Sequence, residues 1–218
     1  MRRHRGLSLL ALGVVVAAVV IAGIVWWVAD DDAPVATAGR GPELNTDHWH
    51  AAFGIDHCGE WLPAQSDVKD DELGIHSHAD GLIHIHPFAA RTSGANADLA
   101  DFLDQVGIVV RPDEVELQDG TTLRVSDGCN GEPAELVVAV WPADAAGTSS
   151  GAERVDSPKA ARIVEDGMAF ALAIVPTSTN GGTDLEQPPS VAGLDDPTAA
   201  ENGGTPSWLV PPTTAGAP

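Results

Sequence analysis

Residues 75–86 read Ile-His-Ser-His-Ala-Asp-Gly-Leu-Ile-His-Ile-His, and this stretch decides how the chain folds. Apolar and polar residues alternate on both sides of Ala-Asp-Gly, a pattern typical of two strands joined by a tight turn. A two-residue Asp-Gly loop would mix histidine and isoleucine on both faces of the hairpin. A three-residue loop, a type I turn followed by a glycine bulge, pairs His76 with His84 and His78 with Leu82. Because a buried face fixes the register, we predict the three-residue loop.

The predicted register separates imidazoles from apolar side chains, since residues two apart on a strand point to the same face. One face then carries His76, His78, His84 and His86. The other face carries Ile75, Ile83 and Ile85. Residues 48–56 alternate in the same way, so that His48 and His50 emerge on the histidine side if Trp49, Phe53 and Ile55 face the core. We therefore expect six imidazoles on one sheet surface, with Asp56 and Asp80 nearby.

This cluster predicts a transition-metal site. Neutral imidazoles held about 5 Å apart by a sheet suit zinc, copper, nickel or iron, although the pattern does not distinguish among these metals. The formal net charge of −21 attracts cations to the protein. The predicted ligands are His48, His50, His76, His78, His84 and His86. The alternative is a polar sheet face that uses histidine without a ligand, or that senses pH.

The sequence favours metal capture, buffering or sensing over catalysis. It contains no His-Glu-x-x-His motif and no glutamate spaced as in cupin oxygenases. The cysteine, histidine and methionine of a blue-copper site are also not close together in the sequence. Two alternatives remain open: a metal-dependent enzyme that uses the same histidines, and a protein-interaction module of the cell envelope.

Residues 6–29 predict a single-pass membrane anchor. These 24 uncharged residues would span about 36 Å as a helix, enough to cross a bilayer core of about 30 Å. Three arginines precede the segment and residues 30–32 are aspartates, which places the N-terminus in the cytoplasm and the remainder outside. The alternative is a signal peptide cleaved near residues 36–38, which would also export the domain.

The charge of the exported part argues against nucleic acid as a partner. Three of the 11 basic residues precede the apolar segment, which leaves 8 basic residues against 32 acidic ones. A surface this acidic repels nucleic acid and anionic lipid headgroups. The predicted partners are the membrane, through the anchor, a metal ion, and a cell-envelope protein.

The two cysteines, Cys58 and Cys129, predict a disulfide, because an exported domain folds in an oxidising compartment. The bond would close a loop of about 70 residues and stabilise the fold by about 4 kcal/mol in the chain-entropy model. The alternative is a thiolate ligand at Cys58, beside His57.

The predicted organisation is a membrane anchor (1–29), a flexible stalk (30–45), an extracytoplasmic domain (46–176) and a disordered Pro/Gly-rich tail (177–218). Period-two alternation predicts strands over residues 48–56, 75–78, 82–88, 115–118, 121–125, 135–141 and 168–175. Apolar residues at helical spacing predict a helix over residues 99–106, packed on the apolar sheet face.

We expect Ser93 or Asn96 to cap the predicted helix and Gly107 to end it. The Gln-Asp-Gly sequence at residues 118–120 predicts a second hairpin with a three-residue loop. The fold class is α+β and mostly antiparallel, with a β-grasp-like order of elements. A β-sandwich is the alternative.

The histidine stretches resemble a group of uncharacterised, membrane-anchored actinobacterial proteins. The resemblance is carried by His-Trp-His-Ala-Ala-Phe-Gly at residues 48–54 with Cys58, and by residues 74–88, which end in His-Ile-His-Pro-Phe. Cys-Asn-Gly at residues 129–131, Val175-Pro176 and Pro-Pro-Ser at residues 188–190 are also similar to that group. The resemblance implies an exported location and no particular reaction.

Overall fold

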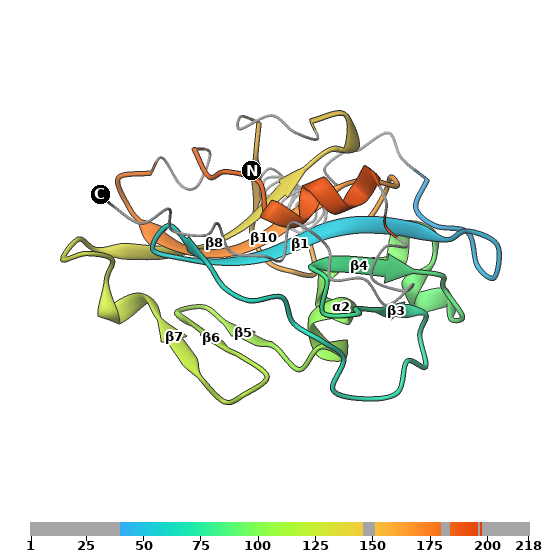
Figure 1. Ribbon diagram of the computed structural model, residues 1–218, viewed down its shortest axis with the longest axis horizontal. Coiled ribbons are helices and arrows are strands. Elements are labelled where there is room, and N and C mark those ends of the chain that lie inside the picture. The colour runs from blue at the N-terminus through green and yellow to red at the C-terminus, as the bar shows by residue number, and fades with distance from the viewer. Residues whose placement is uncertain (1–39, 146–150, 180–183, 196, 198–218) are drawn as a thin grey trace, which may run out of the picture. The chain divides into compact units, whose positions relative to one another are not determined.

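A mixed seven-stranded sheet forms the centre of the computed structural model, which describes residues 40–145, 151–179, 184–195 and 197. The strand order is β3-β4-β1-β10-β8-β9, with β2 paired to β1 (Figure 1). The central strands β1 and β10 are parallel, and the other neighbours are antiparallel. The strands are β1 (Trp49–His57), β2 (Glu60–Trp61), β3 (Ile75–His76), β4 (Leu82–Ile85), β8 (Ala134–Trp141), β9 (Glu153–Val155) and β10 (Ala169–Pro176).

A smaller antiparallel sheet and several short helices complete the domain. The small sheet consists of β5 (Val109–Arg111), β6 (Glu114–Glu116) and β7 (Thr122–Arg124). Among the described residues, the α-helix is α2 (Leu99–Gln105). The 3-10 helices are η1 (Ala90–Thr92), η2 (Gly94–Asn96), η3 (Val125–Asp127), η4 (Ala143–Ala145) and η6 (Pro189–Asp195). The described chain is therefore α+β and mostly sheet, which confirms the predicted fold class.

The predicted apolar face of the sheet is the main core. Ile75, Ile83 and Ile85 are each 0% exposed there and share one apolar cluster with α2. The ring of Phe53 on β1 contacts that of Phe102 on α2, with centroids 5.1 Å apart. Figure 1 shows α2 and the small sheet on the same side of the main sheet. The prediction that the helix packs on the apolar face is confirmed.

The opposite face of the sheet has a second core, covered by η6 (Figure 1). Ala52 on β1 and Trp141 on β8 are buried in it, and Val191 and Leu194 of η6 pack against it. The hydroxyl of Ser190 donates a hydrogen bond of 3.1 Å to the carbonyl oxygen of Phe53. The prediction of a disordered tail is therefore wrong for residues 184–195, whose apolar residues were too few to signal packing.

The predicted register of the histidine hairpin is confirmed. Ile75 pairs with Ile85 and His76 pairs with His84. Both strands are shorter than predicted. The pairing with β4 stops at His76, and His78 forms a β-bridge with Ser66 instead of pairing with Leu82. The turn is also not type I, since Ala79 has a φ of +60°, where a type I turn has negative φ.

The second hairpin also has the predicted register. Val115 pairs with Leu123, and the N–H of Leu117 donates to the carbonyl oxygen of Thr121. The cap of α2 differs from the prediction. Asp98 is the N-cap, and its carboxylate accepts from the N–H groups of residues 100 and 101.

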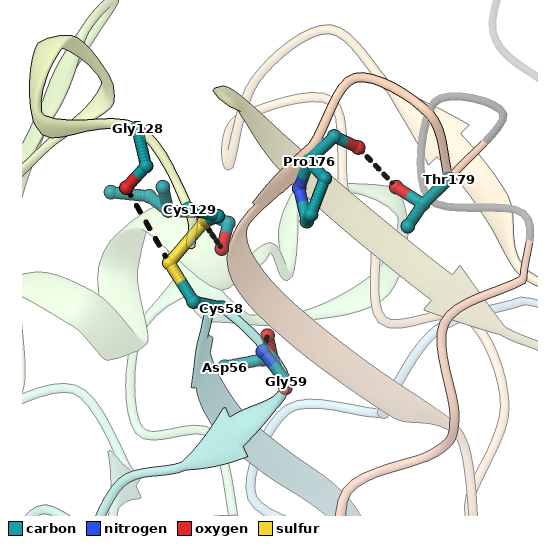
Figure 2. The surroundings of a disulfide bond; sticks show 8 residues. Asp56, Cys58, Gly59, Gly128, Cys129, Pro176 and Thr179 are labelled. Carbon is teal, nitrogen blue, oxygen red and sulfur yellow. Dashed lines mark hydrogen bonds between the residues drawn. A yellow bond between two sulfur atoms is a disulfide. The ribbon is translucent and has the colours of Figure 1, made fainter. Parts of the chain in front are cut away.

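Cys58 and Cys129 form the predicted disulfide, with Cα atoms 5.2 Å apart (Figure 2). The bond joins Cys58, directly after β1, to Cys129, which begins the turn over residues 129–132 that precedes β8. Because Cys58 is in the disulfide, the alternative of a thiolate metal ligand at this position is wrong for this structure.

Only the end of the predicted N-terminal region, from residue 40, lies within the described residues. The predicted membrane anchor, residues 1–29, lies outside the described residues. Within the described ranges, none of the helices has both the length and the apolar character needed to cross a membrane. At the end of the predicted stalk, Gly41 and Pro42 are buried, and the N–H of Gly41 donates to the carbonyl oxygen of Val164. The folded domain therefore begins before residue 46.

Candidate metal centre

Six imidazoles meet on the sheet face opposite the main core, over β3, β4 and β1. These strands lie side by side at one end of the sheet (Figure 1). The pairing places His76, His84 and His50 in one row across the three strands. The ring centroids of neighbouring histidines lie 4.5–5.4 Å apart. We call this set the histidine cluster: His48, His50, His76, His78, His84 and His86.

The histidine cluster passes from the protein interior to the surface. His84 at its centre is 0% exposed. His50, His76 and His86 are half-buried, and His48 and His78 are exposed. A ligand at the surface can therefore reach outer histidines first, while the central imidazole is held by packing.

Asp71 orients His76. One oxygen of this carboxylate, Oδ1, accepts hydrogen bonds from the N–H groups of Leu73, Gly74 and Ile75 at 2.7–3.2 Å. The other oxygen, Oδ2, lies 2.9 Å from Nδ1 of His76. Burial alone would raise the pKa of Asp71, but the backbone hydrogen bonds and the nearby His76 lower it overall. An ionised carboxylate only accepts, so Nδ1 of His76 carries the proton and Nε2 presents a lone pair.

Asp80 has the same arrangement toward His84. Its Oδ1 accepts from the N–H of Leu82 at 2.9 Å, and its Oδ2 lies 2.9 Å from Nε2 of His84. Burial raises the pKa of Asp80, but the hydrogen bonds from His84 and from Leu82 outweigh this and lower it overall. The ionised carboxylate thus holds His84 in the tautomer that has its proton on Nε2.

His76 and His78 are already placed as two ligands of one ion. Their Nε2 atoms lie 3.2 Å apart. Two imidazoles on a tetrahedral ion, with metal–nitrogen bonds of about 2.0–2.1 Å, would have nitrogens about 3.4 Å apart. Burial, followed by repulsion from His86, lowers the pKa of His76, and the attraction of Asp71 only partly offsets this. The imidazole is therefore neutral at pH 7, the form that binds metals.

The loop before β10 fixes His50. Its N–H donates to the carboxylate of Asp166 at 2.7 Å, and its carbonyl oxygen accepts from the N–H of Gly167 at 2.8 Å. Both contacts come from the Glu-Asp-Gly turn at residues 165–167. The backbone of β1 is thereby held where its two histidines join the cluster.

Three groups of side chains in the described chain can each hold an ion, with one ligand atom per residue and all such atoms within 4.8 Å of one another. The edge triad, beside β3, is Asp71, His76 and His86. The middle triad is His76, His78 and His84. The β1 triad is His48, His50 and His84. The edge triad offers one oxygen and two nitrogens, and the other two triads offer nitrogen alone.

The structure brings together all six histidines that the sequence predicted, and Asp80 with them. Asp56 does not join them, since it lies six residues beyond His50 on β1, about 20 Å along the strand. Its carboxylate instead accepts from the N–H of Gly59 at 2.9 Å and lines a cavity of about 320 Å³ beside the disulfide.

Sequence reasoning missed Asp71. This residue lies in the irregular segment before β3, where no periodicity indicates the direction of a side chain. Its spacing of five residues from His76 gave no signal, because the loop geometry alone brings the two side chains together.

Comparison with protein-family models, with curated proteins and with solved structures found no significant match.

Proposed function

We propose that the protein binds a transition-metal ion through the histidine cluster, to capture, buffer or sense the metal outside the cytoplasm. The observation that carries this proposal is the His76–His78 pair with the two carboxylates behind the cluster. One Nε2–Nε2 distance already matches two ligands of one ion. Asp71 and Asp80 each hold an imidazole in a single tautomer.

The carboxylate–imidazole pairs support metal binding over a merely polar sheet face. Metal-binding histidines commonly donate their second ring N–H to a carboxylate, which fixes the ring and makes the ligand nitrogen more basic. Both carboxylates here use one oxygen for backbone N–H groups and the other for an imidazole. They are thus held in place independently of any ion.

The donor set supports a borderline transition metal. Imidazole suits zinc, copper, nickel and iron, whereas calcium and magnesium prefer oxygen-only sites. The middle triad supplies three nitrogens and leaves a coordination position for a fourth ligand. This set does not distinguish among the four transition metals.

The proposed location rests on the sequence and on the disulfide. Structural disulfides persist in oxidising compartments, and the structure contains the Cys58–Cys129 bond. The uncharged residues 6–29 and the arginines before them support an anchor with the domain outside. A protease added to intact cells should therefore cleave the domain, and protection of the domain would contradict this location.

Calorimetric titration of the purified, chelator-stripped full chain tests the proposal. Zn²⁺, Cu²⁺, Ni²⁺ and Fe²⁺ are added separately, and at least one should bind near-stoichiometrically and be released by chelator. The quadruple variant H76Q/H78Q/H84Q/H86Q should lose this binding. His57→Gln is the matched control, since His57 lies on β1 outside the cluster and should leave binding unchanged. Only weak surface binding of all four metals by the unmodified chain would end the proposal.

We also infer a β-grasp-type order for the main sheet. Its support is the parallel central pair of β1 and β10, each with an antiparallel neighbour outside it, and α2 on one face. The small sheet packs Val115 and Leu123 into the same core. Two sheets that pack on one core are also a feature of the β-sandwich, the alternative fold.

A further inference from the structure

We infer that the histidine cluster holds two metal ions at saturation, one in the edge triad and one in the β1 triad. A single ion would instead occupy the middle triad, which shares His76 with the edge triad and His84 with the β1 triad. This inference rests on the proposed function, because it concerns the same cluster. It adds the number of ions that one chain binds and the residues that bind each ion.

The overlap of the three triads determines which can be filled together. The middle triad shares His76 with the edge triad and His84 with the β1 triad. The edge triad and the β1 triad share no residue. An ion in the middle triad therefore takes one ligand from each end triad, so that neither end triad is complete. Ions in the two end triads have no ligand in common and can bind at the same time.

The positions of the carboxylates support two ions. Two dications repel each other, so the second ion needs negative charge close by. Asp71 is itself a ligand of the edge triad. Asp80 lies behind His84, 2.9 Å from its Nε2, and so stands beside the β1 triad. One carboxylate thus serves each end, and the remaining repulsion makes the second ion bind more weakly than the first.

The sharing of single ligands also provides a path between the two states. An ion that moves from the middle triad to the edge triad leaves Nε2 of His76, which faces His78, for Nδ1, which faces Asp71, and Nδ1 gives up its proton to solvent. His84, once released, completes the β1 triad for a second ion. The middle triad is best prepared for a first ion, because its His76 and His78 nitrogens are already 3.2 Å apart.

His78 separates this inference from a single-site arrangement. It belongs to the middle triad and to neither end triad. His78→Gln should therefore weaken binding of the first ion and leave the capacity at two. Loss of an ion in this variant would overturn the inference.

The test is equilibrium dialysis of the chelator-stripped full chain against increasing Zn²⁺, followed by elemental analysis for zinc per chain. The unmodified chain and H78Q should reach two. H48Q and H86Q should each reach one, because each removes one end triad at a position that is exposed or half-buried. The double variant H48Q/H86Q should also reach one, since the middle triad is intact. H76Q/H84Q removes all three triads and should reach zero.

The possible results separate this inference from the proposed function. No zinc on the unmodified chain would end both. One zinc on the unmodified chain, lost in H78Q, would leave the proposed function standing and overturn the two-ion inference. Two zinc ions retained by H48Q/H86Q would place the ions elsewhere and overturn it as well. H57Q, as the control, should reach two, and circular dichroism should show that each variant is folded.

Discussion

The Nε2 atoms of His76 and His78 lie 3.2 Å apart, although only one of these residues belongs to a strand. His76 pairs with β4, while His78 follows the end of β3 and bridges to Ser66. Side chains of alternate residues in an extended chain point the same way, which brings the two rings together. The edge of the sheet thus presents two nitrogens to one point, and Asp71 fixes the tautomer of His76 from behind.

Removal of either orienting carboxylate should weaken metal binding without abolishing it. Loss of such a partner typically costs 10–100-fold in affinity, and we expect about this loss for Asp71→Asn and for Asp80→Asn. The measurement is competition of each variant with a chromogenic chelator for Zn²⁺. Asp119→Asn, at an exposed turn in the other hairpin, is the matched control. Unchanged affinity in both cluster variants would show that the carboxylates do not support the site.

The histidine face was predictable because parity and burial act together. Ile75, Ile83 and Ile85 can all be buried in only one register, and this register also collects the histidines. The strands β8 and β10 were also predictable from the sequence, because each is a run of eight mostly apolar residues that is long enough to be recognised as a strand.

The elements that sequence reasoning missed are short or depend on distant contacts. Strands β2, β5 and β9 have two or three residues each, too few for a period to be recognised. Asp71 and Ser190 acquire their roles through loop geometry and through packing on a sheet that is distant in sequence. The capping of α2 by Asp98 was predictable in principle, because aspartate directly before a helical apolar pattern is a common N-cap.

Removal of the disulfide should destabilise the fold. The bond closes a loop with a sequence separation of 71 residues, for which the chain-entropy model gives about 4 kcal/mol. We expect a loss of about this size in the free energy of unfolding for C58A/C129A, measured by urea denaturation against the oxidised chain. Zinc affinity should change little, because Cys58 follows the end of β1 at His57, about 23 Å along the strand from His50. Equal stability of the two proteins would contradict the entropic account.

The N-cap of α2 should contribute measurably to stability. Asp98→Ala removes the acceptor for two N–H groups and the partner of Lys159 and Arg162. A lost cap typically costs about 1 kcal/mol, and we expect at least this loss in urea denaturation. Asp98→Asn keeps a capping oxygen and loses the charge, so it should be less destabilising. The cap would be unimportant if both variants unfolded at the same urea concentration as the unmodified chain.

Asp56 should reduce stability at neutral pH. Burial raises its pKa above the ordinary value of 3.8, and the hydrogen bond from Gly59 only partly offsets this. The folded state therefore binds this proton more tightly than the unfolded state, so the contribution of Asp56 to stability falls as pH rises from 3.8 through the raised pKa. Asp56→Asn keeps an acceptor for Gly59 and should be the more stable protein at pH 7. The difference should shrink as the pH is lowered toward 3.8. A difference that grew on acidification would reverse the assigned sign.

X-ray absorption at the metal K edge tests the central claim most directly, on the full chain loaded with one equivalent of Zn²⁺ after chelator treatment. We expect a first shell of nitrogen or oxygen at about 2.0–2.1 Å, with the outer-shell scattering of at least two imidazoles and no sulfur at about 2.3 Å. The imidazole scattering should decrease in H76Q/H84Q, which removes a ligand from each of the three triads, and it should be unchanged in H57Q. An oxygen-only shell, or a spectrum that H76Q/H84Q leaves unaltered, would contradict metal binding by the histidine cluster.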